Sequence, residues 1–408
     1  MNVCKKIKKV ALLSIENGIS KSKGGPTRVI YNLLKEHQND TNKMIKLFAV
    51  FSKLIVSYYY DNTVEEKVGN NNVSIIRKYL RKNMPIYIFV SCLRFIKNFY
   101  KLYRREKNFD VINAHDVISG FLYLIFFKRK IRAPLVLTIH SKGSFTKREL
   151  IAQRFVKNLF MFVEKFTVLN SDMIIFPSKG AFEHFSEDIT EVRKVLYKVK
   201  IINNGIDVNE KNYYDEEGIK WILKKVGQRD IILSVSPLVV EKGVDILIKA
   251  FLSLKEEILE KTYLIIIGDG PEYCNLIRLI ENYKRDNLLI INKVIPHKDI
   301  ISLMKKSTIF VLPHRISIFD YVLLEAMLVK LPIITTKVGG NLEIFVENNS
   351  VLFVEKEDVE GLANAITYLL ENKQEREKIV NIAFNLVVSK FTLKEMYKNY
   401  CDVYSKIV

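Results

Sequence analysis

The sequence contains few cysteines, and they are widely separated. Cys4, Cys92, Cys274 and Cys401 are too far apart to form a metal-ligand pair or a redox pair. The chain also has no Asp-x-Asp pair and no cluster of side chains with the spacing of metal ligands. We therefore expect reduced thiols, as in a cytoplasmic protein, and no metal site.

Long apolar runs are also absent. No stretch reaches the roughly 18 residues that a membrane-spanning helix needs, and the nearest, Pro85 to Ile96, contains Arg94. Near the N-terminus, lysines precede the apolar run Val10–Ile15, but this run is short and continues directly into Glu16. It predicts a first β-strand rather than a signal peptide.

Positive charge is present in excess, and it is confined to one half of the chain. The formal net charge is +19, and residues 1–210 contain 37 Lys+Arg against 18 Asp+Glu, whereas residues 211–408 contain 27 of each. A one-sided charge indicates a face that meets an anionic partner, such as a membrane, a phosphorylated acceptor or nucleic acid. Lysine-rich composition without a partner is the alternative. No nucleic-acid recognition module is present, so we expect no nucleic-acid partner.

Short apolar runs alternate with segments of helical period along the whole chain. Such alternation predicts parallel sheets with helices on both faces, and hence an α/β fold of two Rossmann-like, doubly wound domains facing across a cleft. Thirteen strands are expected: Val10–Ile15, Lys46–Phe51, Val73–Arg77, Val111–Ala114, Leu135–His140, Met173–Pro177, Val199–Ile202, Ile231–Val235, Tyr263–Ile267, Leu288–Asn292, Thr308–Leu312, Pro332–Thr335 and Val351–Val354.

The polar stretch that follows Asn203-Asn204-Gly205 is the expected boundary between the domains. We expect one domain over residues 1–205 and a second over residues 206–390. The last helical segment, within residues 391–408, is amphipathic and is expected to pack back onto the first domain.

Two basic segments of the first half are rich in aromatic residues. Met84–Lys107 reads as a helix whose polar positions are mostly cationic, and Phe121–Arg132 contains Lys128-Arg129-Lys130. Basic amphipathic helices of this kind lie in membrane interfaces. A core helix with a solvated basic side explains the same pattern, and both interpretations stay open.

Ligands of open α/β sheets bind where loops leave the carboxyl ends of the strands. In the first half, Gly24 and Gly25 follow the first strand and precede a helix start that includes Arg28. Paired glycines before a helix N-terminus suit a phosphate group. His115 and His140 each follow an apolar strand, which makes them candidate ligand-binding residues.

The second half repeats the strand, glycine turn and helix pattern four times. The residues concerned are Lys242 beside Gly243, Gly268 in Gly-Asp-Gly-Pro-Glu, Ser317 and Asp320 before the helix of Glu325, and Gly339-Gly340 before Glu343. A lysine beside a helix N-terminus would neutralise a leaving diphosphate. Four such loops in one domain predict a nucleotide cleft.

These residues resemble the second-domain motifs of the family 4 glycosyltransferases, which have the GT-B fold. The resemblance rests on Glu-Lys-Gly-Val-Asp at 241–245, Gly-Asp-Gly-Pro-Glu at 268–272, Leu-Leu-Glu-Ala-Met at 323–327 and Gly-Gly-Asn-Leu-Glu at 339–343. Gly24-Gly25 and the His140 loop match the first-domain pattern less specifically.

The resemblance implies a retaining, metal-independent hexosyltransferase that extends a lipid-linked or surface glycan. It implies no cofactor other than a UDP- or GDP-linked sugar as co-substrate. His140, Lys242 and Glu325 would be the catalytic residues. Lys242 would bind the diphosphate and Glu325 the ribose, and His140 would lie near the reacting sugar. The other donor-binding residues would be Gly24, Gly25, Gly268, Ser317, Asp320, Gly339, Gly340 and Glu343, and the acceptor-side candidates are His115 and Arg28.

The basic first half would then bind an anionic membrane surface, which predicts a peripheral protein on the cytoplasmic face of the cell membrane. This chain departs from the family at two positions. Ser317 stands eight residues before Glu325, where the family usually has Glu, and Pro237 stands where it usually has Arg, for which Arg315 is the candidate substitute. A catalytically weak family member that serves as a binding or scaffolding subunit is therefore the alternative function.

Overall fold

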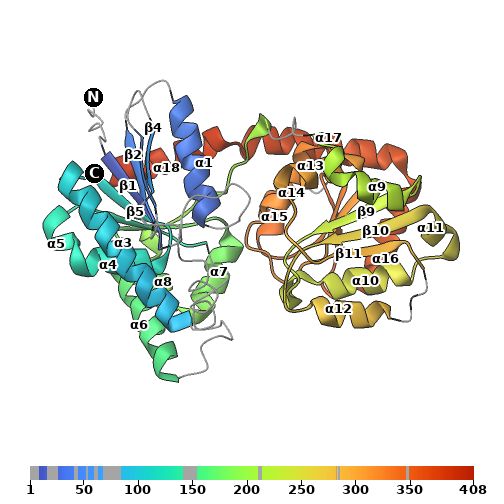
Figure 1. The fold of residues 1–408 in the computed structure, drawn as a ribbon, viewed down its shortest axis with the longest axis horizontal. Helices are drawn as coiled ribbons and strands as arrows, with labels where there is room; N and C mark the ends of the chain where they lie inside the picture. The colour runs from blue at the N-terminus through green and yellow to red at the C-terminus, as the bar shows by residue number, and fades with distance from the viewer. Residues whose placement is uncertain are drawn as a thin grey trace. The chain divides into compact units, whose positions relative to one another are not determined.

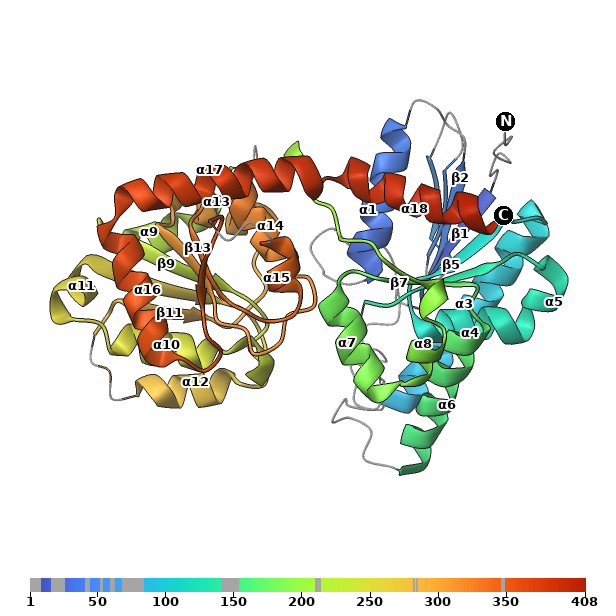
Figure 2. The same ribbon diagram turned by 180° about the vertical axis from the view of Figure 1, so that it is seen from behind.

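The computed structural model describes residues 9–15, 26–40, 45–51, 54–58, 63–67, 84–140, 154–209, 214–281, 283, 285–345 and 349–408. The chain divides into two compact units, shown in Figures 1 and 2. Unit 1 comprises Met1–Gly205 together with Leu393–Val408, and unit 2 comprises Ile206–Thr392.

A single sheet of eight strands forms the centre of unit 1, in the order β4-β3-β2-β1-β5-β6-β7-β8. The six strands from β2 to β8 in this order are parallel, whereas β3 and β4 are antiparallel at one edge. The strands are β1 (Lys9–Leu13), β2 (Lys46–Val50), β3 (Leu54–Tyr58), β4 (Thr63–Lys67), β5 (Val111–Ala114), β6 (Leu135–Thr138), β7 (Met173–Phe176) and β8 (Val199–Ile201).

Six of the seven strands expected in this half are confirmed, and Val73–Arg77 lies outside the described residues. The antiparallel pair β3 and β4 was not predicted. Thr63–Lys67 is largely charged, as exposed edge strands often are, so its sequence lacks the apolar run used to predict strands.

The helices of unit 1 surround this sheet (Figure 1). They are α1 (Pro26–Asn39), α3 (Met84–Glu106), α4 (Val117–Phe126), α5 (Lys128–Ile131), α6 (Arg154–Asn170), α7 (Lys179–Asp188), α8 (Glu191–Lys194) and α18 (Leu393–Ile407). Helix α3 buries one face in an aromatic cluster, in which the rings of Phe99 and Phe127 meet edge to face at 4.7 Å. The interpretation of Met84–Lys107 as a core helix is therefore correct for the face that contains Phe99.

Unit 2 contains a fully parallel sheet of six strands, in the order β11-β10-β9-β12-β13-β14. Its strands are β9 (Asp230–Val235), β10 (Thr262–Ile267), β11 (Leu288–Ile291), β12 (Ile309–Leu312), β13 (Ile333–Thr336) and β14 (Leu352–Val354). All six strands expected in this half are present, and the predicted fold class of two doubly wound α/β units is confirmed.

Both faces of the second sheet are buried. Along β9, Ile231 and Leu233 belong to one hydrophobic cluster, and Ile232 belongs to the other. Because helices cover both faces, the successive central residues Ile231, Ile232 and Leu233 are all apolar, which explains why the strand reads as an apolar run. The helices are α9 (Lys220–Val226), α10 (Val244–Leu252), α11 (Glu256–Lys261), α12 (Tyr273–Ile280), α13 (His297–Lys306), α14 (Tyr321–Leu328), α15 (Gly340–Ile344), α16 (Val359–Glu371) and α17 (Lys373–Lys390).

The chain passes between the units twice, after Gly205 and after Thr392. The two passages lie side by side, because Ile206 donates its N–H to the carbonyl of Phe391 at 2.8 Å and forms a parallel bridge with Thr392. The final helix α18 then belongs to unit 1, where Tyr404 accepts a hydrogen bond from the Asn113 amide at 2.7 Å.

Candidate active site

Polar side chains and tight turns gather at the carboxyl edge of the second sheet. Here β9 is flanked by β10 on one side and β12 on the other, so the loops after β9 and β12 leave at the point where strand order reverses. Gly243 has a left-handed φ of +61°, and a Cβ there would lie 2.0 Å from the Pro313 carbonyl oxygen. Only glycine allows these two loops to approach so closely.

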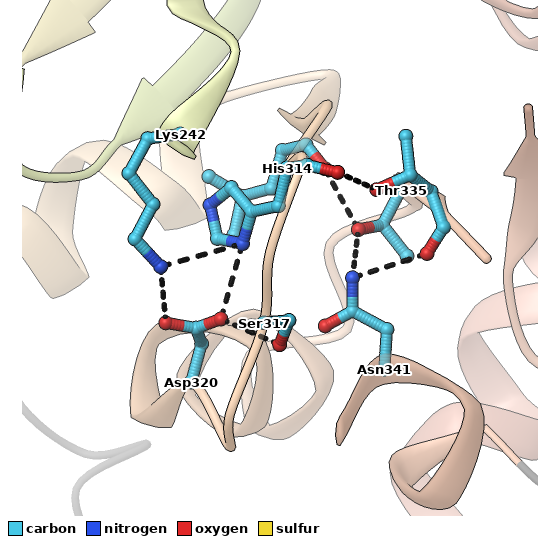
Figure 3. Close-up of polar contacts among 8 residues, drawn as sticks. Lys242, His314, Ser317, Asp320, Thr335 and Asn341 are labelled. Carbon is cyan, nitrogen blue, oxygen red and sulfur yellow. Dashed lines mark hydrogen bonds and ion pairs between the residues drawn. The ribbon is translucent and has the colours of Figure 1, made fainter. Parts of the chain in front are cut away.

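Four side chains meet between these loops, as Figure 3 shows. The ammonium of Lys242 donates to Oδ1 of Asp320 at 2.7 Å. Oδ2 of the same carboxylate lies 3.0 Å from Nδ1 of His314 and accepts from the Ser317 hydroxyl at 2.8 Å. The Lys242 side chain is 7% exposed and that of Asp320 is 20% exposed. The carboxylate is therefore held by three donors and keeps an edge open to solvent.

The charge of Asp320 is stabilised by this arrangement. Burial alone would raise the pKa of its carboxyl group, but Lys242 and His314 hold that pKa well below its usual range. At neutral pH, Lys242 and Asp320 thus form an ion pair at the edge of the sheet. The charge of Lys242 is balanced within the protein before any ligand arrives.

Arg315 does not replace the cation that is missing at Pro237. Its guanidinium forms a two-pronged bond to Asp245, at 2.7 and 2.9 Å, and donates to the carbonyl of Val240 at 2.6 Å. The remaining donors bind the carboxylate of Glu357. Since all five N–H groups are used, the suggestion that Arg315 substitutes for the family's arginine is wrong.

Glu325 lies on α14, and its carboxylate is almost completely buried. Oε1 accepts a hydrogen bond from Nε2 of His297 at 3.0 Å, and the Glu325 side chain is 4% exposed. His297 is the first residue of α13. A buried carboxylate with such a partner is held in a fixed position, as a ligand-binding group must be.

The remaining candidates of unit 2 shape the loops. A Cβ at Gly268 would lie 1.9 Å from the Ser236 carbonyl oxygen, and Gly339 approaches the Ser317 carbonyl equally closely. The N–H of Gly340 donates to that Ser317 carbonyl at 3.1 Å. Gly340 therefore positions the Ser317 loop, and its N–H is already bonded within the protein. Glu343 is partly buried in the short helix α15.

Asn341 ties this loop to the neighbouring strand. Its amide nitrogen donates to the Thr335 hydroxyl at 2.9 Å, and Thr335 in turn donates to the carbonyl of Leu312 at 2.7 Å (Figure 3). These bonds fix the ends of β12 and β13 relative to one another. The loop that contains Ser317 and Asp320 is therefore anchored on both sides.

In unit 1 the corresponding reversal of strand order lies between β1 and β5. His115 and His140 follow β5 and β6, and the structure brings them together: Nδ1 of His115 lies 3.1 Å from Nε2 of His140. Arg28 is buried in the first turn of α1. Gly24 and Gly25 lie outside the described residues.

Both histidines are neutral at physiological pH. Burial, and after it the nearby His140, holds the pKa of His115 well below its usual range. Burial lowers the pKa of His140 to about 3. The adjacent Asp116 has a raised pKa because of burial, although its carboxylate accepts the backbone N–H groups of Ser119 and Ile15.

Two functional candidates were missed in the sequence. His314 stands two residues after β12, and His297 begins the helix after β11. His115 and His140 were selected because each closely follows a strand, and the same rule applied to β12 finds His314. His297 stands at a helix start further along the loop after β11, where this rule gives no signal.

Neither a metal cluster nor a membrane span was found within the described ranges. No three His, Cys, Asp or Glu side chains gather there in the geometry of a metal site. Likewise, none of the helices described is long and apolar enough to cross a membrane.

Two family models match adjacent segments of the chain. The model described as Glycosyltransferase Family 4 matches residues 23–210, and the one described as Glycosyl transferases group 1 matches residues 215–386. The gap between the matches falls close to the first passage between the units, after Gly205. Each model thus corresponds to one unit.

Individual proteins are similar over most of the chain. It is 26% identical over 311 residues to 2-deoxystreptamine N-acetyl-D-glucosaminyltransferase of Niallia circulans, covering 74% of this chain and 77% of that protein. It is 23% identical over 310 residues to N-acetyl-alpha-D-glucosaminyl L-malate synthase of Bacillus anthracis, covering 74% and 76% respectively. Among solved structures, HepE of Anabaena in complex with UDP and glucose is similar with a TM-score of 0.68. It is 16% identical and covers 98% of this chain and 99% of that one, a likeness that supports the fold.

Proposed function

This chain belongs to the family 4 glycosyltransferases, with the GT-B fold, and from that membership we propose which reaction it performs. It transfers a hexose from a UDP- or GDP-linked donor to a hydroxyl of a lipid-linked or surface-glycan acceptor, with retention of anomeric configuration. It requires no resident metal or other cofactor. The observation that carries the proposal is the ion pair of Lys242 and Asp320 on loops that meet at the strand-order reversal of unit 2, with the buried Glu325 on the helix α14 that follows.

Asp320 supplies the carboxylate that Ser317 lacks. The family usually has a glutamate at position 317, whereas here the Ser317 hydroxyl donates to Asp320 at 2.8 Å. With one bond on Oδ1 and two on Oδ2, the carboxylate retains acceptor capacity on its exposed edge. We assign this edge to a hydroxyl of the donor sugar.

Lys242 contacts the leaving diphosphate. An ammonium has three N–H donors, and one of them is used by Asp320 at 2.7 Å. A second donor would reach a phosphate oxygen, so that Lys242 bridges the sugar-binding carboxylate and the leaving group. It stabilises the negative charge that develops as the bond between the sugar and the phosphate breaks.

The chemical step is a front-face displacement. The bond from the anomeric carbon to the phosphate oxygen breaks, and the acceptor hydroxyl attacks from the same side of the sugar. The hydroxyl proton passes to the departing phosphate, which leaves as the nucleoside diphosphate. Because the leaving group itself receives the proton, the protein contributes mainly positioning and charge stabilisation.

The donor is identified by thermal stabilisation with a panel of UDP-, GDP- and ADP-linked hexoses and N-acetylhexosamines. A ligand that binds the native state raises its stability by mass action, by about 2.7 kcal/mol at a hundredfold excess over its Kd. The complex of Anabaena HepE with UDP and glucose favours uridine nucleotides as the first to test. No shift with any member of the panel would contradict the proposal.

An activity assay separates the enzyme from a scaffolding subunit. A glycosyltransferase releases nucleoside diphosphate slowly even without acceptor, because water reaches the donor sugar. Asp320→Asn should lose this activity by about a hundredfold, since the amide neutralises the carboxylate and places a donor where a sugar hydroxyl needs an acceptor. Lys249→Gln, on the exposed side of α10, is the matched control and should retain it. Donor binding with no hydrolysis by the unaltered protein would favour the scaffold.

We further propose that unit 1 docks on an anionic membrane, at the cytoplasmic face. The solvent face of α3 exposes Phe89 and Leu93, at 62% and 52%, beside Lys97 and Lys101. Helix α4 ends in Ile125 and Phe126, which are also exposed, and α5 follows with Lys128-Arg129-Lys130.

Cations next to exposed apolar side chains match the chemistry of an anionic lipid surface. The cations would contribute about 1 kcal/mol each near such a surface, and the apolar residues would insert between the headgroups. A lipid-linked acceptor would be reached from this position.

A further inference from the structure

The two histidines of unit 1 form a hydrogen-bonded pair with parallel rings. Their rings are almost parallel, at 5°, with centroids 5.4 Å apart. The His115 ring also packs against the ring of Tyr400 of α18, with the ring centroids 6.2 Å apart and an interplanar angle of 19°. The backbone N–H of His115 donates to the carbonyl of Leu13 at 2.8 Å. His115 is therefore fixed by three separate elements, β1, β6 and α18.

A second polar pair joins β5 and β6 two residues before the histidines. Asn113 on β5 accepts from the Thr138 hydroxyl on β6 at 2.9 Å, and each residue stands two positions before a histidine. The Asn113 amide donates to the Tyr404 hydroxyl at 2.7 Å. The same strands thus present two successive polar pairs, and α18 supports both.

The position of the protons in the histidine pair follows from burial. The His115 ring is completely buried, and its Nε2 has no hydrogen-bond partner among the described residues. If Nε2 carried the proton, a buried N–H would lack an acceptor, at a cost of about 1–3 kcal/mol. An unpaired lone pair is tolerated more easily than an unpaired N–H. The neutral ring of His115 therefore carries its proton on Nδ1.

The position of the proton on His115 determines which nitrogen of His140 is protonated. Nδ1 of His115 must donate across the 3.1 Å contact, so Nε2 of His140 accepts. A neutral imidazole has one N–H, so the proton of His140 lies on Nδ1. No described residue forms a hydrogen bond with that nitrogen, and His140 is only partly buried.

We propose that His115 is a positioning residue that holds His140 in the Nδ1-protonated tautomer, which leaves that N–H available to an oxygen of the acceptor. The role of His115 rests on the proposed function, which supplies the ligand of His140. The tautomer of His140 does not depend on that function. Tyr400 packs against the His115 ring and the Leu13 carbonyl binds the His115 backbone N–H, and His115 fixes both the orientation and the protonation of His140.

Two substitutions of similar size test the role. In His115→Asn, the amide nitrogen occupies the place of Nδ1 and can still donate to His140. In His115→Gln, the amide lies one atom further along the side chain, at the place of Nε2. We expect His115→Asn to keep kcat within about threefold of the unaltered enzyme. We expect His115→Gln to lose about tenfold or more, with similar thermal stability and a similar KM for the donor. Equal losses in both variants would overturn the proposal.

Nitrogen-15 NMR of histidine-labelled full-length protein measures the tautomer without any substrate. The resonances are assigned by comparison with His115→Asn and His140→Gln. We expect a protonated Nδ1 and an unprotonated Nε2 for both rings near neutral pH. A protonated Nε2 on His140 would refute the tautomer, whatever reaction the enzyme catalyses. If instead the NMR result holds but no sugar nucleotide is turned over, the proposed function fails and the tautomer stands.

Discussion

Removing the Lys242 ammonium should destabilise unit 2 as well as abolish transfer. The sequence indicates only that Lys242 is a cation beside Gly243 at a helix start. In the structure it is 7% exposed and is paired with Asp320, so Lys242→Ala leaves a largely buried carboxylate without its cation. Breaking a fully buried pair costs about 3–5 kcal/mol. The cost should be lower here, about 2–3 kcal/mol, because Asp320 keeps its bonds to His314 and Ser317.

Thermal and chemical denaturation of the full chain measure this cost. A loss of about 2–3 kcal/mol lowers Tm by roughly 4–12 °C in a unit the size of Ile206–Thr392. Lys249→Ala, which removes a half-exposed lysine from an ion pair of 3.6 Å with Asp245, is the control and should change stability by less than about 0.5 kcal/mol. The double variant Lys242→Ala/Asp320→Asn should recover most of the lost stability, since no unpaired charge remains.

Acid denaturation tests the sign of the same effect. The pKa of folded Asp320 lies below its ordinary value of 3.8, so its contribution is complete above that value and is lost as the pH falls through the folded pKa. In Lys242→Ala the folded pKa rises, and this acid-dependent loss should shrink. The reasoning is refuted if Lys242→Ala unfolds at the temperature of the unaltered protein and with the same acid dependence.

Three further predictions concern other parts of the molecule. Glu325→Gln should weaken donor binding, measured by calorimetry, about tenfold with little change in Tm, because the amide lacks the charge that strengthens hydrogen bonds to the ribose. Retained affinity with a lowered Tm would show that Glu325 has a structural role. Phe99→Ala removes a fully buried ring that contacts four other aromatic rings, and should cost about 3–5 kcal/mol in denaturant unfolding. A loss below about 1 kcal/mol would mean that the cluster repacks. The third variant replaces five cations of α3 with Gln: Arg94, Lys97, Lys101, Arg104 and Arg105. It should sediment less with anionic vesicles while turnover of a soluble acceptor persists. Unchanged sedimentation would exclude α3 as the anchor. The matched control replaces five exposed cations of unit 2: Lys220, Lys224, Lys225, Lys373 and Lys378.

The sequence predicted the parallel strands because each is buried on both faces. Ile231 to Leu233 are all apolar, since neighbouring side chains enter opposite hydrophobic clusters. The edge strand β4, Thr63–Lys67, has no such requirement and gave no signal. The aromatic helix α3 was ambiguous because one face packs in the core and the other is exposed, and only the fold separates the two.

Candidate site residues were found where a strand ends in a polar or glycine-rich turn, as for Lys242, His115 and His140. Their partners could not be predicted, because pairing depends on contacts between distant segments. In the sequence, Arg315 has no evident partner. In the structure its N–H groups bind Asp245 and Glu357, which are 70 and 42 residues away in the chain. In the same way, nothing local indicates that Asp320 lies against Lys242, 78 residues earlier.

The return of α18 to unit 1 has a consequence for how the protein is made. The ribosome completes residues up to Gly205 first, but the rings of Tyr400 and Tyr404, which complete the packing around His115 and Asn113, are synthesised only after the whole of unit 2. During that interval the nascent first unit lacks one of its helices, and His115 and Asn113 are without their contacts to α18. Unit 2, whose residues are continuous in the chain, can finish folding before unit 1 does. The segment synthesised first is therefore the last to reach its native structure, and a premature stop before Tyr400 removes both tyrosines that pack near residues 113 and 115.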